Sequence, residues 1–131
     1  MIVLDTHAWV WWLSSPAKLS PPARKIIDRS MENNEIFISS ISAWEVAILV
    51  AKGRLKLTID VNDWIAKSEK LPFVTFIPID NTIAVKSVSL PGPIHSDPAD
   101  RIIVATATTV GAPIVTRDER ILSYPYVETV W

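Results

Sequence analysis

Four acidic residues stand where predicted strands end and predicted helices begin. Asp5 directly follows the apolar run MIVL, and Asp118 follows the run APIVT with one arginine between them. Glu45 and Asp100 each lie in the first turn of a predicted helix, the first after the strand EIFIS and the second after a proline-rich loop. In open parallel sheets, ligands bind beyond the carboxyl ends of the strands, where the following helices start. The positions of these carboxylates therefore indicate one candidate site.

Each acid also has a purely structural interpretation. Asp5 and Asp118 could cap helix N-termini. The sequence SAWE at 42–45 fits a capping box, in which a serine and a glutamate bind each other's backbone. In the stretch DPAD, Asp97 could cap the helix while Asp100 interacts favourably with the helix dipole. Taken one at a time, the acids are explained equally well by helix-start chemistry.

Convergence of the acids at one point would require a compensating cation. The helices after three of them are very apolar (WVWWL, VAILVA and IIVATA), which favours burial of their first turns. Two carboxylates about 4 Å apart repel each other by about 4 kcal/mol at an effective dielectric constant of about 20, which raises the pKa of each. The chain has no cysteine and only two histidines, and carboxylate oxygens suit Mg²⁺ or Mn²⁺. The composition therefore predicts one of these ions rather than zinc.

Strand-like and helix-like segments alternate along the chain. Short apolar runs predict strands at 1–4, 35–39, 74–79, 112–116 and 127–131. Helices are predicted at 6–13, 20–33, 42–53, 61–70, 81–89 and 97–111, with a short helix or turn at 118–124. Alternation of this kind favours a parallel sheet with helices on both faces. We therefore expect one α/β domain over residues 1–131, a three-layer α/β/α sandwich with a mainly parallel central sheet.

The composition limits how the chain could meet a polyanion or a membrane. The formal net charge of -1 excludes strong attraction of the whole molecule to nucleic acid, so any such contact must be local or carried by a metal. No apolar run approaches the roughly 18 residues of a membrane span. The apolar N-terminal segment contains Asp5 and lacks the basic lead of a signal peptide. With no cysteine in the chain, these features agree with a cytoplasmic protein.

Four segments of the chain resemble PIN-domain ribonucleases of the VapC-type toxin group. They are VLDTHAWVWWL, ISSISAWEVAILVAKGRL, HSDPADRIIVATA and IVTRDERI. None is highly specific alone, but together they cover nearly the whole chain in the order and spacing of the family. The resemblance implies a PIN-like parallel-sheet fold and metal-dependent cleavage of RNA. It also implies a homodimer and a cognate antitoxin that blocks the site.

The resemblance assigns roles to the acids by position. Asp5, Glu45, Asp100 and Asp118 match the acidic constellation of the family, which implies that they are catalytic and bind one or two Mg²⁺ or Mn²⁺ ions. Hydrolysis by a metal-activated water leaves a 5′-phosphate and a 3′-hydroxyl. We therefore expect these RNA ends, and 2′,3′-cyclic phosphate ends would contradict the mechanism.

Other residues beside the acids have open roles. Asp97 lies at the capping position of its helix, and we interpret it as a cap or as support for a metal ligand. Thr6 and Thr116 could orient a carboxylate or a metal-bound water, although turn hydrogen bonding is an equal alternative. His7 could contact substrate or position an acid, whereas His95 is interpreted as a loop residue.

Basic residues likewise have two interpretations each. The segment KGRLK forms a local basic patch of Lys52, Arg54 and Lys56. This patch could contact an RNA backbone or simply complement a helix C-terminus. Arg101 and Arg117 could contact phosphate, but for Arg101 a salt bridge with one of the acids is the preferred interpretation.

The tryptophans suggest both a core and an interaction surface. Six are present, and four of them occur by residue 44. Core packing must account for some of them. Because large exposed apolar patches mark interaction sites, we expect at least one of this group to bind the antitoxin: Trp9, Trp11, Trp12 and Trp44.

Three other interpretations compete with a nuclease. The sequence VLDTH is similar to the aspartate nucleophile motif of haloacid-dehalogenase-like phosphatases, but those enzymes need a second aspartate where this chain has His7. A catalytically inactive PIN-fold module that binds RNA or protein would keep the fold and do no chemistry. A structural protein would use the acids only as helix caps. The presence of all the family's acids favours the nuclease.

Overall fold

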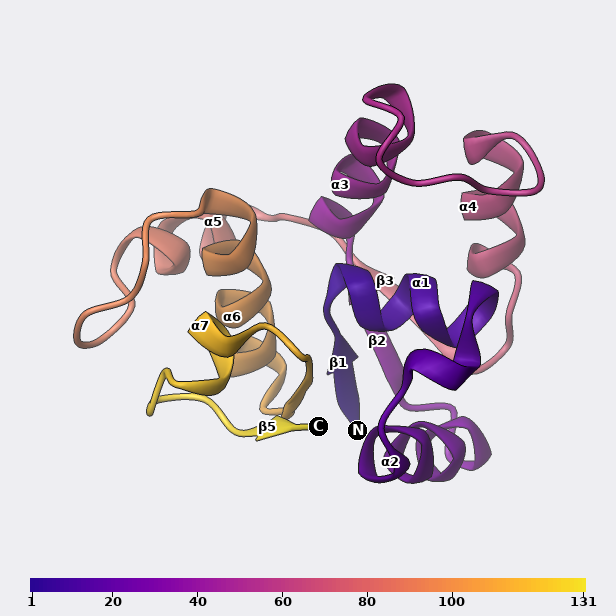
Figure 1. Cartoon of the computed structure of the whole chain (residues 1–131). Coiled ribbons are helices and arrows are strands. Elements are labelled where there is room, and N and C mark those ends of the chain that lie inside the picture. The colour runs from indigo at the N-terminus through magenta and orange to yellow at the C-terminus, as the bar shows by residue number, and fades with distance from the viewer.

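The computed structural model describes residues 1–131, and a five-stranded sheet lies at its centre (Figure 1). The strands are β1 (Ile2–Leu4), β2 (Ile36–Ser39), β3 (Val74–Ile77), β4 (Ile114–Val115) and β5 (Thr129–Val130). Their order across the sheet is β3-β2-β1-β4-β5, and every neighbouring pair is parallel. The chain therefore starts in the middle of the sheet, extends it on one side and then extends it on the other.

Helices connect the strands and cover the sheet. They are α1 (Thr6–Ser14), α2 (Pro21–Glu32), α3 (Ser40–Ala51), α4 (Val61–Glu69), α5 (Asn81–Val88), α6 (Pro98–Val110) and α7 (Glu119–Leu122), with a short 3₁₀ helix at Pro16–Lys18. Figure 1 shows α5, α6 and α7 grouped on one side of the sheet, and α1, α2 and α4 on the other. None of these helices has the length and apolar character needed to cross a membrane.

The side chains of β1 divide the interior into two cores because they alternate between the two faces of the strand. Ile2 and Leu4 lie in a core shared with α1, α2, α3 and α4. Val3 lies in the other core, which is completed by α5, α6 and α7. A parallel sheet buried on both faces explains why its strands are continuous apolar runs. The predicted three-layer α/β/α class is confirmed.

Most predicted elements are present, and the largest differences concern the last strands and α3. β4 and β5 each contain two residues, where runs of five were predicted. α3 begins at Ser40 rather than at 42 because Ser39, the last residue of β2, caps it directly. The Ser39 hydroxyl accepts from the Ile41 amide at 3.2 Å. The capping box predicted for SAWE is therefore wrong, since these residues lie inside the helix.

The boundaries of α6 agree with those that its sequence predicts. The Asp97 carboxylate caps the helix, and Pro98 occupies the first helical position. Gly111 ends it with a φ of 73°, a left-handed conformation that glycine adopts at little cost. Strong local signals at both ends thus place Asp100 in the first turn, on the side that faces the sheet.

Candidate active site

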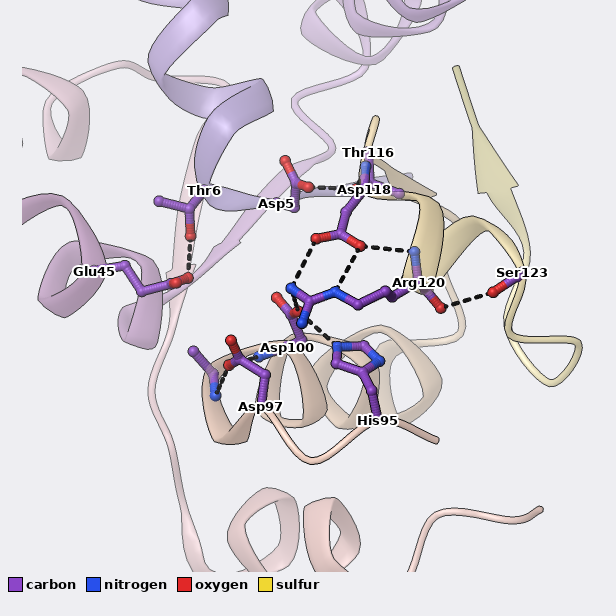
Figure 2. Close-up of polar contacts among 11 residues, drawn as sticks. Asp5, Thr6, Glu45, His95, Asp97, Asp100, Thr116, Asp118, Arg120 and Ser123 are labelled. Atoms are coloured by element: carbon purple, nitrogen blue, oxygen red, sulfur yellow. Dashed lines mark hydrogen bonds and ion pairs between the residues drawn. The ribbon is translucent and has the colours of Figure 1, made fainter. Parts of the chain in front are cut away.

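The four predicted acids lie at the carboxyl edge of the sheet (Figure 2). Asp5 follows β1 and Asp118 lies just beyond β4, and these two strands are neighbours. The helices after β1 and β4 pack on opposite faces, so the sheet has its topological switch point here, where ligands bind in folds of this kind. Asp100 comes from α6 and Glu45 from α3. The sequence therefore correctly predicted that the four acids lie at the carboxyl edge of the sheet.

Asp5 is the most buried of these acids, with 6% of its surface exposed. One carboxylate oxygen caps α1 by accepting from the Ala8 amide at 2.8 Å. The other accepts from the Thr116 hydroxyl. Burial raises the pKa of Asp5 to about 6, against the opposing effect of these two hydrogen bonds, and the negative charge of Asp100 raises it further. The charge of His7 opposes the shift, but burial outweighs it, so the net change in the pKa of Asp5 is upward.

Thr116 connects two of the acids. Its hydroxyl donates to the Asp5 carboxylate and its oxygen accepts from the Asp118 amide at 3.0 Å. Thr116 is fully buried and its backbone pairs with β5 through Val130. The hydroxyl of Thr116 therefore makes both contacts considered for it, one with a carboxylate and one within the local turn.

Glu45 and Thr6 form a second pair, to one side of the other acids (Figure 2). The Thr6 hydroxyl donates to the Glu45 carboxylate at 2.5 Å, and its oxygen also lies 2.9 Å from the Ser42 hydroxyl. Burial raises the pKa of Glu45, the Thr6 hydrogen bond opposes that shift, and the charge of Asp100 adds to it. Because α3 starts at Ser40, Glu45 lies in the second turn of its helix and not in the predicted first.

Asp100 is nearly buried and has two nitrogen partners on one oxygen. Its Oδ2 lies 2.7 Å from the His95 Nε2 and 3.2 Å from a guanidinium nitrogen of Arg120. Burial raises the pKa of Asp100, the His95 hydrogen bond opposes this, and the charges of Asp97 and Asp118 add to it. His95 was interpreted only as a loop residue, and its contact with Asp100 depends on how the proline-rich loop folds back over α6.

Arg120 is a site residue that the sequence reasoning missed. Its Nη2 lies 3.2 Å from Oδ2 of Asp100 and 3.2 Å from Oδ2 of Asp118. Burial raises the pKa of Asp118, but the side-chain and backbone hydrogen bonds of Arg120 outweigh it, so the net shift is downward. The sequence does contain a signal for this contact, since the arginine in RDER lies two positions after the capping aspartate. A four-residue helix turns such a side chain back towards the residue that caps it.

Asp97 caps the helix that carries Asp100, whereas Arg101, the residue after Asp100, turns away from the acids. Asp97 accepts from the amides of Ala99 and Asp100 at 2.9 and 3.2 Å, as expected of a cap. Arg101 donates to the carbonyls of Ser87 and Val88 at the end of α5, so the salt bridge predicted with an acid is wrong. One residue along an α-helix rotates the side chain by about 100°. That rotation aims Arg101 at α5 when Asp100 faces the sheet.

A cavity of about 330 Å³ opens beside the acids. Its lining combines carboxylates, bases and one aromatic ring: Asp5, His7, Trp11, Arg117 and Asp118. Two larger cavities, one between α1 and α4 and one between α5 and α6, are lined by no acidic residue. The exposed side chains of His7 and Arg117 at this opening therefore remain candidates for contact with a substrate.

The basic patch lies away from the acids. Lys52 follows the last residue of α3, and Arg54 and Lys56 are exposed in the loop beyond it. Glu45 is seven residues before Lys52, which corresponds to about 10 Å along a helix axis. In Figure 1 the carboxyl end of α3 points away from the sheet. A ligand would have to extend along α3 to reach both the patch and the acids.

The tryptophans proposed to bind a partner divide into buried and accessible ones. Trp9 is 0% exposed, and its indole N–H donates to Ser68 at 3.2 Å inside the first core. Trp9 is therefore one of the tryptophans that pack in the core, and it is excluded as a candidate for partner binding. Trp11 and Trp12 are half-buried against other aromatic rings. Trp44 is 58% exposed on α3, so it can contact another protein without rearrangement.

The donor set of the site consists of oxygen atoms, which suits a hard divalent cation. Asp5, Asp100 and Asp118 influence one another electrostatically, as the raised pKa values show. Even so, no three Asp, Glu or His side chains are arranged so that they could hold one ion as they stand. The guanidinium of Arg120 is the positive group that contacts both Asp100 and Asp118 in this arrangement.

Comparison with known proteins gives matches over the whole domain. The sequence model of the PIN domain matches residues 2–125. Ribonuclease VapC22 of Mycobacterium tuberculosis (strain ATCC 25618 / H37Rv) is 35% identical over 132 residues, which cover 99% of this chain and 98% of the relative.

Solved structures share the fold at lower sequence identity. VapBC2 from Rickettsia felis, bound to a DNA fragment from its promoter, matches with a TM-score of 0.72 at 20% identity, over 98% of this chain and 97% of that one. A toxin-antitoxin complex from Klebsiella pneumoniae matches with a TM-score of 0.63 at 21% identity, over 95% and 93% of the two chains.

Proposed function

Because the chain belongs to the PIN domain family, as its four acidic motifs predicted, we propose that it is a metal-dependent endoribonuclease. The observation that carries the proposal is the placement of Asp5, Asp100 and Asp118 around the switch point of the sheet. Beyond the effect of burial, the charge of Asp100 raises the pKa of Asp5 and the charge of Asp118 raises the pKa of Asp100, so a bound cation would stabilise the ionised forms of these carboxylates. A site of this kind fits hydrolysis of a phosphodiester bond, and the relative named as a ribonuclease supports RNA as the substrate.

Asp5, Asp100 and Asp118 would hold Mg²⁺ or Mn²⁺, with Glu45 as a further ligand from α3. A divalent ion bound there supplies a water of lowered pKa and offsets negative charge on the phosphate. The donor chemistry fits this role, and one or two ions are compatible with four carboxylates. Because no three of these side chains are arranged to hold one ion in the structure, binding of the cation would require some of them to rotate.

The chain's own hydrogen bonds would keep these carboxylates in fixed orientations. Thr116 and the Ala8 amide each bind one oxygen of Asp5, and Thr6 binds Glu45. The Nε2 of His95 lies 2.7 Å from Oδ2 of Asp100. Partners of this kind raise the precision with which ligands are placed. Their role is positioning, and the bond to phosphorus is made by water.

Cleavage of RNA by the purified chain tests the proposal. RNA incubated with Mn²⁺ or Mg²⁺ should be cut to products with a 5′-phosphate and a 3′-hydroxyl, and excess EDTA should stop the reaction. Products with 2′,3′-cyclic phosphate would overturn the mechanism. Metal binding without cleavage of transfer, ribosomal or messenger RNA would favour the inactive binding module instead.

We also propose that the chain is the toxin of a toxin-antitoxin pair and that it forms a homodimer. Two of its structural relatives are VapBC2 and a toxin-antitoxin complex, and Trp44 offers an exposed indole next to Glu45. A protein that covers Trp44 would therefore contact α3, the helix that carries Glu45.

The partner and the dimer need separate measurements. The tagged chain purified from its own cells should carry a small protein that inhibits cleavage, and Trp44→Ala should lose it. Val85→Ala, which alters an exposed apolar residue on α5, is the matched control.

Light scattering of the chain alone should give a mass of twice 14.6 kDa, and a monomer would overturn the dimer.

A further inference from the structure

Arg120 occupies the space between two of the acids (Figure 2). Its Nη2 is 3.2 Å from Oδ2 of Asp100 and 3.2 Å from Oδ2 of Asp118. Its Nε lies 3.4 Å from the other oxygen of Asp118, and its backbone amide donates to that same oxygen at 2.8 Å. Both oxygens of Asp118 and one of Asp100 are therefore engaged by a single residue.

The two carboxylates come from different parts of the chain. Asp100 lies on α6 and Asp118 caps α7, so nothing in the local sequence forces them together. The charge of Asp118 raises the pKa of Asp100, whereas the Arg120 hydrogen bonds lower the pKa of Asp118. The Arg120 guanidinium thus offsets the charge of Asp118, while His95 opposes the raised pKa of Asp100.

The side chain of Arg120 lies at the surface, in contrast to the acid that it contacts on α6. The side chain of Arg120 is 56% exposed, against 13% for Asp100. Ion pairs of an exposed side chain are weak, because solvent screens them and the side chain loses entropy. Arg120 can therefore leave without opening the core, while the two carboxylates, which are part of helix N-termini, stay where they are.

We propose that Arg120 is a displaceable counter-ion, which holds Asp100 and Asp118 before a divalent cation binds and leaves when the cation arrives. The inference rests on the proposed function, since it concerns the cation proposed for the same site. The guanidinium and the cation need the same carboxylate oxygens. The positive charge of a divalent cation would also repel the positive charge of the guanidinium. Binding of the two is therefore mutually exclusive at Asp118.

Arg117 provides a matched control for this role. It is adjacent to Asp118 in sequence and lines the same cavity, but it is exposed and forms no ion pair. Arg120→Gln and Arg117→Gln remove one positive charge each within a few residues of the site. A general effect of charge would appear equally in both variants, whereas competition for the carboxylates would appear only in Arg120→Gln.

Calorimetric titration of the purified chain with Mn²⁺, without RNA, measures the competition. Arg120→Gln should bind Mn²⁺ roughly five- to tenfold more tightly than wild type, the equivalent of about two exposed ion pairs. Arg117→Gln should stay within about twofold of wild type, as screening of a separated charge allows. In EDTA, Arg120→Gln should melt at a lower temperature than Arg117→Gln, and Mn²⁺ should raise its melting temperature more than that of wild type.

Each contrary result has a separate meaning. Equal affinities in the two variants, or weaker binding by Arg120→Gln, would overturn the counter-ion role and leave the metal site standing. If wild type and both variants bind neither Mn²⁺ nor Mg²⁺, the metal site proposed above is overturned, and the inference falls with it. Should Arg120→Gln fail to fold, Arg120→Lys keeps the charge without the planar fork. It should then bind Mn²⁺ more tightly than wild type, and unchanged affinity would overturn the inference.

Discussion

The aspartates that cap α1 and α7 differ from those that cap α4 and α5, although all make the same local hydrogen bond. Asp5 and Asp118 each accept from a backbone amide at 2.8 Å, and Asp60 and Asp80 each do so at 2.9 Å. The second oxygen of Asp5 is bound by the Thr116 hydroxyl. Asp60 and Asp80 are exposed and have no side-chain donor.

Position in the sheet explains the difference. Asp80 follows β3 and opens α5, just as Asp5 follows β1 and opens α1. But β3 is an edge strand, whereas β1 has a neighbour on either side. Only a central strand brings other strand ends next to the acid that follows it. The comparison teaches that a capping aspartate becomes part of a site through its tertiary partners and not through its local motif.

Loss of the Asp5 charge should have the largest effect on RNA cleavage. It should also distinguish the capping aspartates of the site from Asp60 and Asp80, which cap helices elsewhere. Asn caps helices as well as Asp does, so Asp5→Asn and Asp80→Asn should both fold. We expect Asp5→Asn to reduce the rate of RNA cleavage by at least about a hundredfold, a typical cost of losing a charge-stabilising group. Asp80→Asn should cleave at the wild-type rate. Equal losses in the two variants would show that helix capping, and not the site, is being measured.

The raised pKa of Asp5 has a consequence for stability with a defined sign. Its pKa is raised from 3.8 to about 6, so the folded state retains a proton that the unfolded state releases. The free energy of unfolding therefore falls as the pH rises from about 4 to about 6, by about 3 kcal/mol in total. In EDTA, Asp5→Asn should exceed wild type in stability by about this amount at pH 7.

Urea unfolding of both forms at pH 7 and pH 4 checks this prediction. At pH 4 the stability difference between Asp5→Asn and wild type should nearly vanish, because Asp5 is protonated in the folded protein. A difference that is the same at both values of pH would point to packing rather than charge. The matched variant Asp80→Asn should show no gain at pH 7.

Removal of the Thr116 hydroxyl should have an intermediate effect. Thr116→Val keeps the volume but removes the donor to Asp5 and the acceptor for the Asp118 amide. Loss of a group that orients metal ligands costs about 10- to 100-fold in affinity or activity. Titration with Mn²⁺ and cleavage assays should show such a loss. Thr106→Val, also fully buried but bonded to a carbonyl of its own helix, should retain both.

Substitution of Asp97 should have the smallest effect on RNA cleavage, because Asp97 only caps its helix, as Asp60 and Asp80 do. Asp97→Ala should lower the free energy of unfolding by about 1 kcal/mol, while Asp97→Asn should be nearly neutral. Both variants should cleave RNA at a rate within a few-fold of wild type. A large loss of cleavage in Asp97→Asn, with stability unchanged, would instead make its charge part of the site.

The sequence predicted those features that depend on neighbours along the chain. Alternating apolar segments predicted the parallel sheet, and Asp97, Pro98 and Gly111 predicted both ends of α6. Such signals act within one turn of a helix or one strand. The acids themselves were identified because each stands at a strand end or a helix start, which can be read locally.

The features that were missed depend on packing between distant segments. His95 and Arg120 contact Asp100 only because the proline-rich loop and α7 both fold against the start of α6. Arg101 was expected beside an acid, but the end of α5 supplies carbonyls at the place where its side chain emerges. The sequence did not tell which of the four N-terminal tryptophans is buried, and Trp9 is buried because Trp64 and Phe76 pack against it.

The hydrogen bond between Thr116 and Asp5 joins residues 111 positions apart. A ribosome makes about 5 to 20 residues per second, so several seconds separate the synthesis of the first acid from that of the hydroxyl that holds it. During that interval β1 has no β4 beside it, and the edge that gathers the acids does not exist. The contact between Thr116 and Asp5 is therefore among the last that the growing chain can make, and the site stays incomplete until nearly the whole domain has been synthesised.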